Sequence, residues 1–480
     1  MDAWNSLFAC LEQEPDRPLL RGARWWNRGD VAAAAGGLAR RLKEAGVRAG
    51  DRVVVGWPAS VEALVAVFGV QGAGAVAVPL NPRSGADEVA HAVADCDPAA
   101  IVAPAGWGPA GRPRLGVAGA PAPWTRPDRA DEDPALIVYT SGTTGPSKGA
   151  VLSYRAVAAN ISALTTAWRW SADDDLVLAL PLFHVHGLCI GGYGTLIHGA
   201  RARVVPFDPA GIAAELRAGG SVFMGVPTMY GRLLRWLDAG GDATGFASAR
   251  LFTSGSAALP ADWHRRWEEH TGHRILERYG MSETLLTLSN PYEGERRAGS
   301  VGTAVGGCEV VVVGDDGPVG PGELGEIRVR GTSLFSGYWG NPTATSAAYD
   351  GDWFLTGDLA TVGPDGRVAI AGRRSADLIK TDGWKVGARE IEDLLRQHPG
   401  VGEIAVLGVP DPQRGERIVA AVVAHPGEAS DGLAWAAELQ AFVGDRLAAY
   451  KRVRQVRLID ALPRNALGKV QKHRLRELDW

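Results

Sequence analysis

Residues 140–149 read TSGTTGPSKG and directly follow the apolar run ALIVY at 135–139. The apolar run predicts a buried strand, and the residues after it combine glycines, hydroxyl side chains and one lysine. Small residues let a backbone approach a ligand closely, and the amides of such turns bind anions. The pattern is not a Walker A loop, because Lys148 follows Ser147 and precedes Gly149. We therefore expect another kind of phosphate-binding loop, with a plain surface turn as the alternative.

The size and composition of the chain exclude several classes of protein. Its 480 residues exceed the usual size of one hydrophobic core, so two or more domains are expected. A formal net charge of -4 argues against a nucleic-acid partner. The four cysteines share no zinc or disulfide spacing. The N-terminus lacks a signal-like segment and no run of 18 apolar residues occurs, so we expect no membrane partner and a cytoplasmic location.

Apolar runs alternate with segments of helical period through the first 300 residues. RVVVGW at 52–57, VAVPL at 76–80 and LVLALPLF at 176–183 are typical of buried strands, and VAAAAGGLARRLKEAG at 31–46 is typical of a helix. This alternation predicts layers of parallel α/β structure. Ligand sites of parallel sheets lie at the carboxyl ends of their strands, where the loop at 140–149 is expected.

The pattern of predicted strands and turns changes twice towards the C-terminus. Short strands and glycine turns at about 301–370 predict a small β subdomain, and the residues beyond it suffice for a compact α+β domain. The predicted fold class is α/β, with a large N-terminal domain of layered α/β subdomains plus the β subdomain, and a small mobile α+β C-terminal domain. We place these domains at 1–372 and 378–480, with a hinge at 373–377.

LERYGMSET at 276–284 reads as a strand that leads into a helix. Tyr279 is suited to stacking on a base, and Glu283 is suited to holding the Mg²⁺ that accompanies a nucleotide triphosphate. The alternative is a helix start capped by Ser282 or Thr284.

The histidines of PLFHVHGL at 181–188 follow another predicted strand. Because no third ligand is near in the sequence, we interpret His184 and His186 as walls of a pocket rather than a metal pair. Buried core histidines are the alternative.

Three more candidates lie in the last third of the chain. Asp358 follows a glycine and is suited to accepting both hydroxyls of a ribose, while Arg373 ends a predicted strand. Lys469 follows a glycine in LPRNALGKVQK at 462–472. The alternatives are an ordinary turn aspartate and a solvated basic tail.

In sequence order, the chain resembles the adenylate-forming acyl-CoA synthetase superfamily in YTSGTTGPSKG, PLFHVHG, GVPTMY, SGSAALP, ERYGMSET, GELGEIRVRG, FLTGD, LIKTDGWKV and LPRNALGK. The resemblance covers nearly the whole chain. Within the superfamily, PLFHVHGL, MGVPTMY, SGSAALP, ERYGMSET and NPYEGERRAGSVG are most similar to malonyl-CoA and methylmalonyl-CoA synthetases.

The resemblance implies an ATP-dependent acid-CoA ligase that activates a malonate-type acid as acyl-AMP, releases pyrophosphate, and transfers the acyl group to coenzyme A with release of AMP. ATP, Mg²⁺ and CoA are therefore the expected small molecules. The catalytic residues that it implies are Lys148, Glu283, Thr284 and Lys469, with Glu283 as the magnesium ligand.

The same resemblance implies residues that bind the nucleotide or CoA. They are Thr140, Ser141, Gly142, Thr143, Thr144, Gly145, Ser256, Ala257, Glu277, Arg278, Tyr279, Gly280, Met281, Ser282, Asp358, Arg373, Lys380 and Trp384.

The acid pocket is expected to include His186, Met224, Arg296 and Arg297. A guanidinium group binds a second carboxylate in bidentate fashion, and a monocarboxylate pocket has no use for one. A solvent-exposed arginine pair on a loop is the alternative.

Three other functions stay open. The first is the same chemistry on another small, medium-chain or aryl acid, and the second is acyl transfer to a separate carrier protein. The third is a non-catalytic nucleotide-binding protein, which is expected to have lost Lys148, Glu283, Asp358 or Lys469. All four residues are present.

Overall fold

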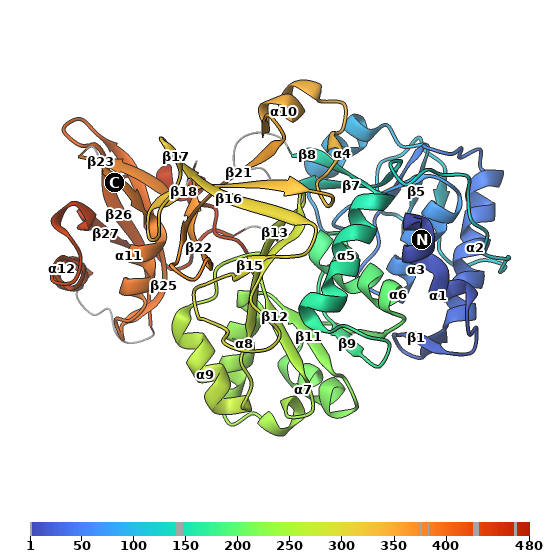
Figure 1. The fold of residues 1–480 in the computed structure, drawn as a ribbon, viewed down its shortest axis with the longest axis horizontal. Helices are drawn as coiled ribbons and strands as arrows, with labels where there is room; N and C mark the ends of the chain where they lie inside the picture. Colours follow the sequence, from blue (N-terminus) through green and yellow to red (C-terminus); the bar gives the residue numbers. More distant parts are fainter. Residues whose placement is uncertain (1, 141–146, 375–376, 383, 426–431, 465–467) are drawn as a thin grey trace. The chain divides into compact units, whose positions relative to one another are not determined.

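The computed structural model describes residues 2–140, 147–374, 377–382, 384–425, 432–464 and 468–480 (Figure 1). The chain divides into two compact units. The N-terminal unit comprises Met1–Val310 and Val329–Phe354, and the C-terminal unit comprises Val311–Arg328 and Leu355–Trp480. The boundaries at 372 and 378 and the hinge at 373–377 stay predictions, and residues 375 and 376 of that hinge lie outside the described residues.

The N-terminal unit contains a nine-stranded sheet. Its central strands are parallel, and antiparallel strands flank them at both ends. In spatial order the strands are β15 (Thr303–Ala304), β14 (Leu285–Ser289), β13 (Leu276–Met281), β12 (Leu251–Ser254), β11 (Val222–Gly225), β9 (Asp175–Leu178), β10 (Arg201–Val204), β1 (Pro18–Arg21) and β2 (Trp25–Asn27).

A seven-stranded sheet forms the second sheet of this unit. Its strands run in the order β19 (Gly337–Tyr338), β8 (Lys148–Ser153), β7 (Pro134–Thr140), β4 (Val76–Pro79), β3 (Arg52–Val55), β5 (Ala100–Val102) and β6 (Arg114–Leu115). The strands from β7 to β6 are parallel, whereas β8 and β19 are antiparallel to their neighbours.

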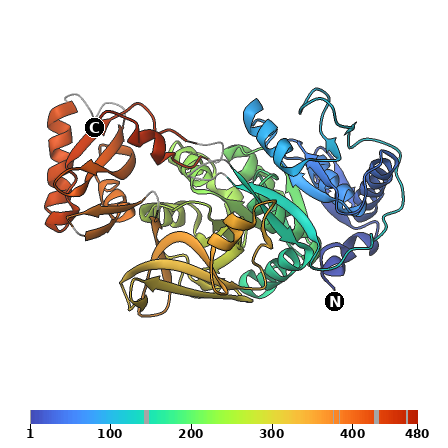
Figure 2. The same ribbon diagram turned by 90° about the horizontal axis from the view of Figure 1, so that it is seen from above.

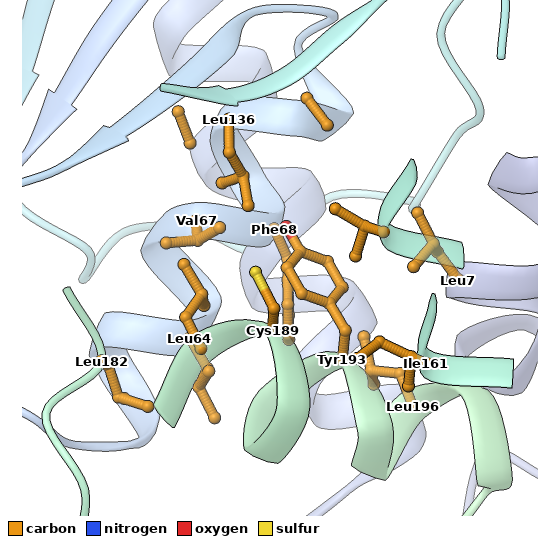
Figure 3. Close-up of a cluster of buried hydrophobic side chains, with 14 of the residues drawn as sticks. Leu7, Leu64, Val67, Phe68, Leu136, Ile161, Leu182, Cys189, Tyr193 and Leu196 are labelled. Atoms are coloured by element: carbon orange, nitrogen blue, oxygen red, sulfur yellow. The ribbon is translucent and has the colours of Figure 1, made fainter. Parts of the chain in front are cut away.

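One large core joins the two sheets through a layer of helices. The helices are α1 (Ala3–Glu12), α2 (Arg28–Glu44), α3 (Val61–Gly72), α5 (Tyr154–Trp168), a π-helix (His186–Tyr193) and α6 (Gly194–His198). Figure 3 shows side chains of this core, with Phe68 and Tyr193 close to Leu136 of β7. The apolar runs are long because the strands of each sheet are buried on both faces.

Side chains that alternate along single strands show which helices cover the outer face of each sheet. In β9, Leu176 and Leu178 enter the large core, while Val177 faces a second core built with α7 (Pro209–Arg217), α8 (Pro227–Asp238), a 3₁₀ turn (Ala243–Phe246) and α9 (Ala261–Thr271). In β3, Val53 and Val55 enter the large core, while Val54 faces α4 (Ala86–Cys96). The N-terminal unit thus has alternating α and β layers, as its sequence predicts.

A smaller sheet follows in the chain. It contains β17 (Gly317–Pro318), β16 (Cys308–Gly314), β18 (Leu324–Gly331), β21 (Trp353–Val362) and β20 (Tyr349–Asp350), with β22 (Val368–Arg373) paired to β21. Helix α10 (Pro342–Ala347) precedes β20. The division between the units falls within β16, β18 and β21.

The last hundred residues form an α+β fold, drawn in the darker orange and red near the C label in Figure 2. Its sheet has the order β24 (Trp384–Gly387), β23 (Leu378–Thr381), β26 (Gly415–Ala424) and β25 (Val401–Asp411), with β27 (Gln455–Leu458) parallel to β26. Helices α11 (Ala388–Leu395) and α12 (Gly432–Gly444) cover one face, and α13 (Lys472–Arg476) packs on the other through Leu475. A 3₁₀ turn (Ala449–Lys451) precedes β27.

None of the helices described in either unit is long and apolar enough to cross a membrane.

Candidate active site

The loop at 140–149 connects two antiparallel strands, β7 and β8. Residues 141–146 lie outside the described residues, and they include the predicted Ser141, Gly142, Thr143, Thr144 and Gly145. The described ends of the loop face each other, because Thr140 pairs with Lys148 across the hairpin. The Oγ1 hydroxyl of Thr140 donates to the carbonyl oxygen of Lys148 at 3.4 Å.

Helix α4 holds the C-terminal end of this loop, a role that the sequence did not reveal. Nε2 of His91 lies 2.9 Å from the carbonyl oxygen of Ser147. The hydroxyl of Tyr139 in β7 donates to Oδ2 of Asp95 at 2.6 Å and to the carbonyl oxygen of Ala92 at 3.1 Å. These contacts fix the strand end and the residue before Lys148 to one helix.

The predicted helix after LERYGM is wrong, because β13 turns back into the antiparallel strand β14. Leu285 has a φ of +56°, a left-handed conformation that does not continue a right-handed helix. Gly280 makes the tight return possible, since a Cβ there would lie 1.8 Å from the carbonyl oxygen of Leu285. The hairpin turn presents Glu283.

Glu283 is buried and bound by a tyrosine from a distant part of the chain. The hydroxyl of Tyr338 in β19 donates to Oε1 of Glu283 at 2.9 Å. The ring centroid of Tyr338 lies 5.0 Å from Nζ of Lys148. One side chain therefore touches both the predicted magnesium ligand and the lysine of the loop.

Other predicted residues of this hairpin have internal partners. Oε1 of buried Glu277 accepts from Nε2 of His264 at 2.8 Å and from the amide of Gly299 at 2.9 Å. The Oγ1 atom of buried Thr284 accepts from Thr287 at 2.7 Å. The remaining members are half-buried, namely Tyr279, Gly280, Met281 and Ser282.

A buried cationic group lies next to this hairpin. Arg278 of β13 is 4% exposed, and within the described part of the chain its Nε and Nη2 have no hydrogen-bond partner. Gly255 lies against the guanidinium, because a Cβ there would be 2.6 Å from Cζ of Arg278. Desolvation lowers the pKa of Arg278 to about 9. A guanidinium buried this deeply calls for an anion.

One histidine of PLFHVHGL, His186, lies near this arginine, and His184 lies near His186. Strand β9 ends at Leu178, so the histidines do not continue it, and His186 starts the π-helix. Both ring nitrogens of His186 have no partner among the described residues. Burial, with the charge of Arg278 second, holds the pKa of His186 well below its ordinary value, and burial lowers that of His184 to about 4. A neutral His186 ring therefore lies near Arg278.

Other predicted residues of the acid and nucleotide sites are placed differently. Met224 is fully buried in β11, as part of the large core. Ser256 and Ala257 are exposed after β12, and Ser256 has a φ of +69°. The guanidinium of Arg296 donates to the carbonyl oxygens of Arg274, Tyr292 and Pro291 at 2.6, 2.7 and 3.3 Å.

Arg297, the other member of the predicted arginine pair, is exposed. It donates to Oε2 of Glu295 at 3.3 Å. The assignment of the distal carboxylate to Arg296 or Arg297 stays a prediction.

The C-terminal unit holds its own cluster of predicted residues. Asp358 and Arg373 are cross-strand partners in β21 and β22, with Nε of Arg373 2.8 Å from Oδ1 of Asp358. Burial and the charge of Arg373 lower the pKa of Lys469, while Asp358 and Asp377 act to raise it. The lysine therefore lies within reach of these charges.

Lys380 and Trp384, the predicted CoA residues, lie on neighbouring strands of this unit. The Lys380 side chain is exposed in β23. The ring of Trp384 is 55% exposed and stacks on Tyr450, with centroids 4.5 Å apart. An exposed aromatic ring stacked on a second ring suits a flat or apolar ligand.

Comparison with protein families matches residues 7–339 to the AMP-binding enzyme family and residues 390–469 to the AMP-binding enzyme C-terminal domain. A malonate-CoA ligase of Arabidopsis thaliana is 39% identical over 371 residues, which are 72% of this chain. The match spans 61% of the length of that relative.

Two solved structures are similar over nearly the whole chain. ATP-bound MatB from Rhodopseudomonas palustris is 37% identical, with a TM-score of 0.92 over 99% of both chains. A malonyl-CoA ligase with methylmalonyl-CoA and AMP bound is 44% identical, with a TM-score of 0.73 over 95% of this chain and all of the other.

Proposed function

Because the chain belongs to the AMP-binding enzyme family, whose adenylate-forming fold it shares, we propose that it is an ATP-dependent malonate-CoA ligase. In the first step a carboxylate oxygen of the acid attacks the α-phosphorus of ATP, which gives acyl-AMP and pyrophosphate. In the second step the thiol of CoA attacks the acyl carbon, and AMP leaves. The matched ligase of Arabidopsis thaliana and the complex with methylmalonyl-CoA and AMP support this reaction.

Arg278 is the observation that carries the choice of acid. It is a buried guanidinium with two nitrogen atoms unpartnered in the described residues, and the neutral ring of His186 lies near it. A carboxylate that accepts from Nε and Nη2 would complete these hydrogen bonds in bidentate fashion. The reacting carboxylate of the acid must face ATP, so this one is the second. We therefore favour Arg278 over Arg296 and Arg297 as the anchor of a malonate-type acid.

Lys148, Tyr338 and Glu283 are suited to the triphosphate of ATP. Mg²⁺ is commonly held by one or two carboxylates together with phosphate oxygens, which fits the buried carboxylate of Glu283. Mg²⁺, when bound, neutralises phosphate charge. Lys148 adds a second positive charge, and Tyr338 orients Glu283 by its hydrogen bond. Because their motifs match those of the family, we assign residues 140–144 to the phosphates of ATP and Thr284 to the same phosphate site.

The remaining assignments follow the same family pattern. Tyr279 flanks the adenine, Asp358 and Arg373 bind the ribose, and Lys469 neutralises charge during adenylation. Arg278 is assigned to the acid instead of the nucleotide. We assign to the nucleotide the other residues of these motifs, which are Gly145, Ser256, Ala257, Glu277, Gly280, Met281 and Ser282, and we assign Lys380 and Trp384 to CoA. The N-terminal domain at 1–372 binds ATP and acid, and the domain at 378–480 turns on the hinge at 373–377 between the two steps. We also expect the protein in the cytoplasm.

The test measures CoA consumption with ATP and Mg²⁺ across malonate, methylmalonate, ethylmalonate, succinate, acetate, octanoate and benzoate. Malonate or methylmalonate is expected to give the highest kcat/KM. Arg278→Met should lower kcat/KM for malonate by about 100-fold, the effect of a lost charge-assisted bidentate contact, and should leave the low rate with acetate unchanged.

Arg296→Ala and Arg297→Ala are the matched arms. If one of these two variants loses the preference for malonate while Arg278→Met retains it, the anchor of the second carboxylate is Arg296 or Arg297. If a monocarboxylate gives the highest kcat/KM with the unmodified enzyme, the substrate of the ligase is not a malonate-type acid. ATP binding without turnover of any acid would identify a non-catalytic nucleotide-binding protein. Transfer of the acyl group from acyl-AMP to a carrier protein but not to CoA, with release of AMP, would make the carrier protein the acceptor.

A further inference from the structure

Lys472, the first residue of α13, buries its ammonium group between two carboxylates of the C-terminal unit. Its Nζ donates to Oδ1 of Asp377 and lies 2.7 Å from Oε1 of Glu392. The side chains of Lys472 and Glu392 are each 12% exposed, and that of Asp377 is 19% exposed. Breaking a buried pair leaves a charge without compensation. These three residues, here called the Lys472 cluster, therefore hold each other firmly in place.

Asp377 connects the cluster to the end of β22. Its Oδ2 accepts from the amide of Arg373 at 2.8 Å, and its own amide donates to the carbonyl oxygen of Arg373 at 2.7 Å. Gly372, with a φ of +138°, permits this approach, because a Cβ there would lie 2.4 Å from Cβ of Asp377. The carbonyl oxygen of Asp377 accepts from the amide of Ala388 at 2.9 Å, where α11 begins. Asp377 thus joins β22 to α11.

Glu392 connects the cluster to the centre of the five-stranded sheet. It lies on α11, and its Oε1 accepts from the amide of Val406 in β25 at 2.9 Å. Burial lowers the pKa of Lys472, but Glu392 and Asp377 outweigh burial and hold that pKa above its ordinary value. The ammonium group is therefore charged at neutral pH, and its position is fixed by a helix and two strands.

Lys472 also ends the segment that carries Lys469. The amide of Gln471 donates to the carbonyl oxygen of Pro463 at 2.8 Å, and Arg464 forms an antiparallel bridge with Val470. Gly468 has a φ of +77° and accepts from Nη1 of Arg464 at 2.6 Å. The C-terminal side of the segment thus has its anchor at Lys472, three residues after Lys469.

We propose that Lys472 is a positioning residue for Lys469, and that the Lys472 cluster sets where the Lys469 ammonium group lies relative to Asp358 and Arg373. The inference rests on the proposed function for the role of Lys469 in adenylation. Misplacing a catalytic group by about 1 Å costs about 100-fold in rate. Loss of the cluster should therefore impair adenylation and spare the thioester step, in which Lys469 has no assigned role.

Lys472→Met removes the charge and retains the length of the side chain. Lys451→Met is the matched control, because Lys451 pairs with Glu390 at 2.6 Å in the same unit but outside the Lys472 cluster. We measure malonate-dependent exchange of pyrophosphate into ATP, and separately thioester formation from malonyl-AMP and CoA. Lys472→Met should lower the exchange by about 100-fold and change thioester formation by less than about threefold, while Lys451→Met should change neither. Equal loss in both steps, or full exchange, would overturn the inference.

A second readout is independent of activity. Acetic anhydride acylates unprotonated, accessible amines, and mass spectrometry of the peptide that contains Lys469 gives its labelling rate. Lys472→Met should change this labelling rate by at least about threefold, because the exposed Lys469 amine then moves relative to Asp358 and Arg373, the charges that act on its pKa. An unchanged labelling rate would overturn the inference. Failure of the unmodified enzyme to exchange pyrophosphate with any acid would refute the proposed function, and the labelling experiment would still test the inference.

Lys472→Arg decides the matter if Lys472→Met does not fold. The arginine keeps the positive charge, but its planar guanidinium does not reproduce the ammonium geometry. The expected result is a folded protein with impaired exchange and retained thioester formation. Full exchange in a folded Lys472→Arg variant would mean that the cluster serves stability alone, and the inference would be wrong.

Discussion

The hydroxyl of Tyr338 donates a 2.9 Å hydrogen bond to Oε1 of Glu283, and the ring of the same tyrosine lies 5.0 Å from Nζ of Lys148. Glu283 is buried, so its carboxylate is oriented by protein contacts rather than by bulk water. The strand pairing of β19 with β8 brings Tyr338 next to the strand that starts at Lys148. Tyr338 therefore contacts both Glu283 and Lys148, the two groups that the proposed reaction needs at the triphosphate.

Tyr338→Phe should raise the KM for MgATP and lower kcat/KM by about 10- to 100-fold, because a hydrogen bond to a charged group contributes about 1.5–3 kcal/mol. Steady-state kinetics at varied MgATP would measure the effect. Tyr154→Phe is the control, since the buried hydroxyl of Tyr154 has no partner among the described residues. Equal kinetics for Tyr338→Phe and the unmodified enzyme would contradict an orienting role.

The pH dependence of adenylation should report on Lys469. Burial and Arg373 lower the pKa of this lysine from its ordinary value of 10.5, so the folded protein loses the positive charge at a lower pH than a free lysine does. The rate of pyrophosphate exchange should therefore fall as pH rises through this lowered pKa. Lys469→Arg should move the fall to higher pH. A profile that is flat up to the ordinary lysine pKa would argue against the assignment.

Acid should destabilise the pocket around Arg278. His184 has a folded pKa of about 4 against an ordinary value of 6.5, and the pKa of His186 is lowered too. Between these values the unfolded chain binds more protons than the folded one, so stability is lost as pH falls from 6.5 towards 4. We expect a loss of about 2 kcal/mol, discounted because the His184 ring is partly exposed.

Urea unfolding at pH 7 and at pH 5 would measure this loss. A variant with His184→Gln and His186→Gln should show a smaller difference between the two pH values, because neither glutamine titrates. An identical difference in both proteins would assign the acid sensitivity to other groups.

Gly280→Ala should disrupt the hairpin that presents Glu283. The new Cβ would lie 1.8 Å from the carbonyl oxygen of Leu285, so the backbone must move, and we expect at least about 3 kcal/mol of destabilisation. Gly272→Ala is the matched control, because its φ is +74° but the space around its Cβ is open, so about 1 kcal/mol is expected. Thermal unfolding would compare them. A harmless Gly280→Ala variant would show that the β13–β14 turn is not confined as described.

The sequence predicted most of the layered architecture, because strands buried on both faces leave continuous apolar runs such as those of β3, β4 and β9. It failed at the turn after LERYGM, where a steric constraint between Gly280 and Leu285 selects a hairpin that composition does not reveal. It also missed Tyr338, which is 55 residues from Glu283, and Asp377, which is 95 residues from Lys472. Such contacts depend on sheet order, which local patterns do not contain.

The four cysteines have a practical consequence at the bench. Cys10, Cys96 and Cys189 are buried, Cys308 is partly exposed, and burial raises the pKa of every one of them, to about 12 for Cys10 and about 11 for Cys96. Thiolates are the form that reacts with aromatic disulfide reagents, so these side chains should react slowly in the native state. The free thiol of CoA can then be titrated colorimetrically in the presence of the intact enzyme, with little background from the protein itself.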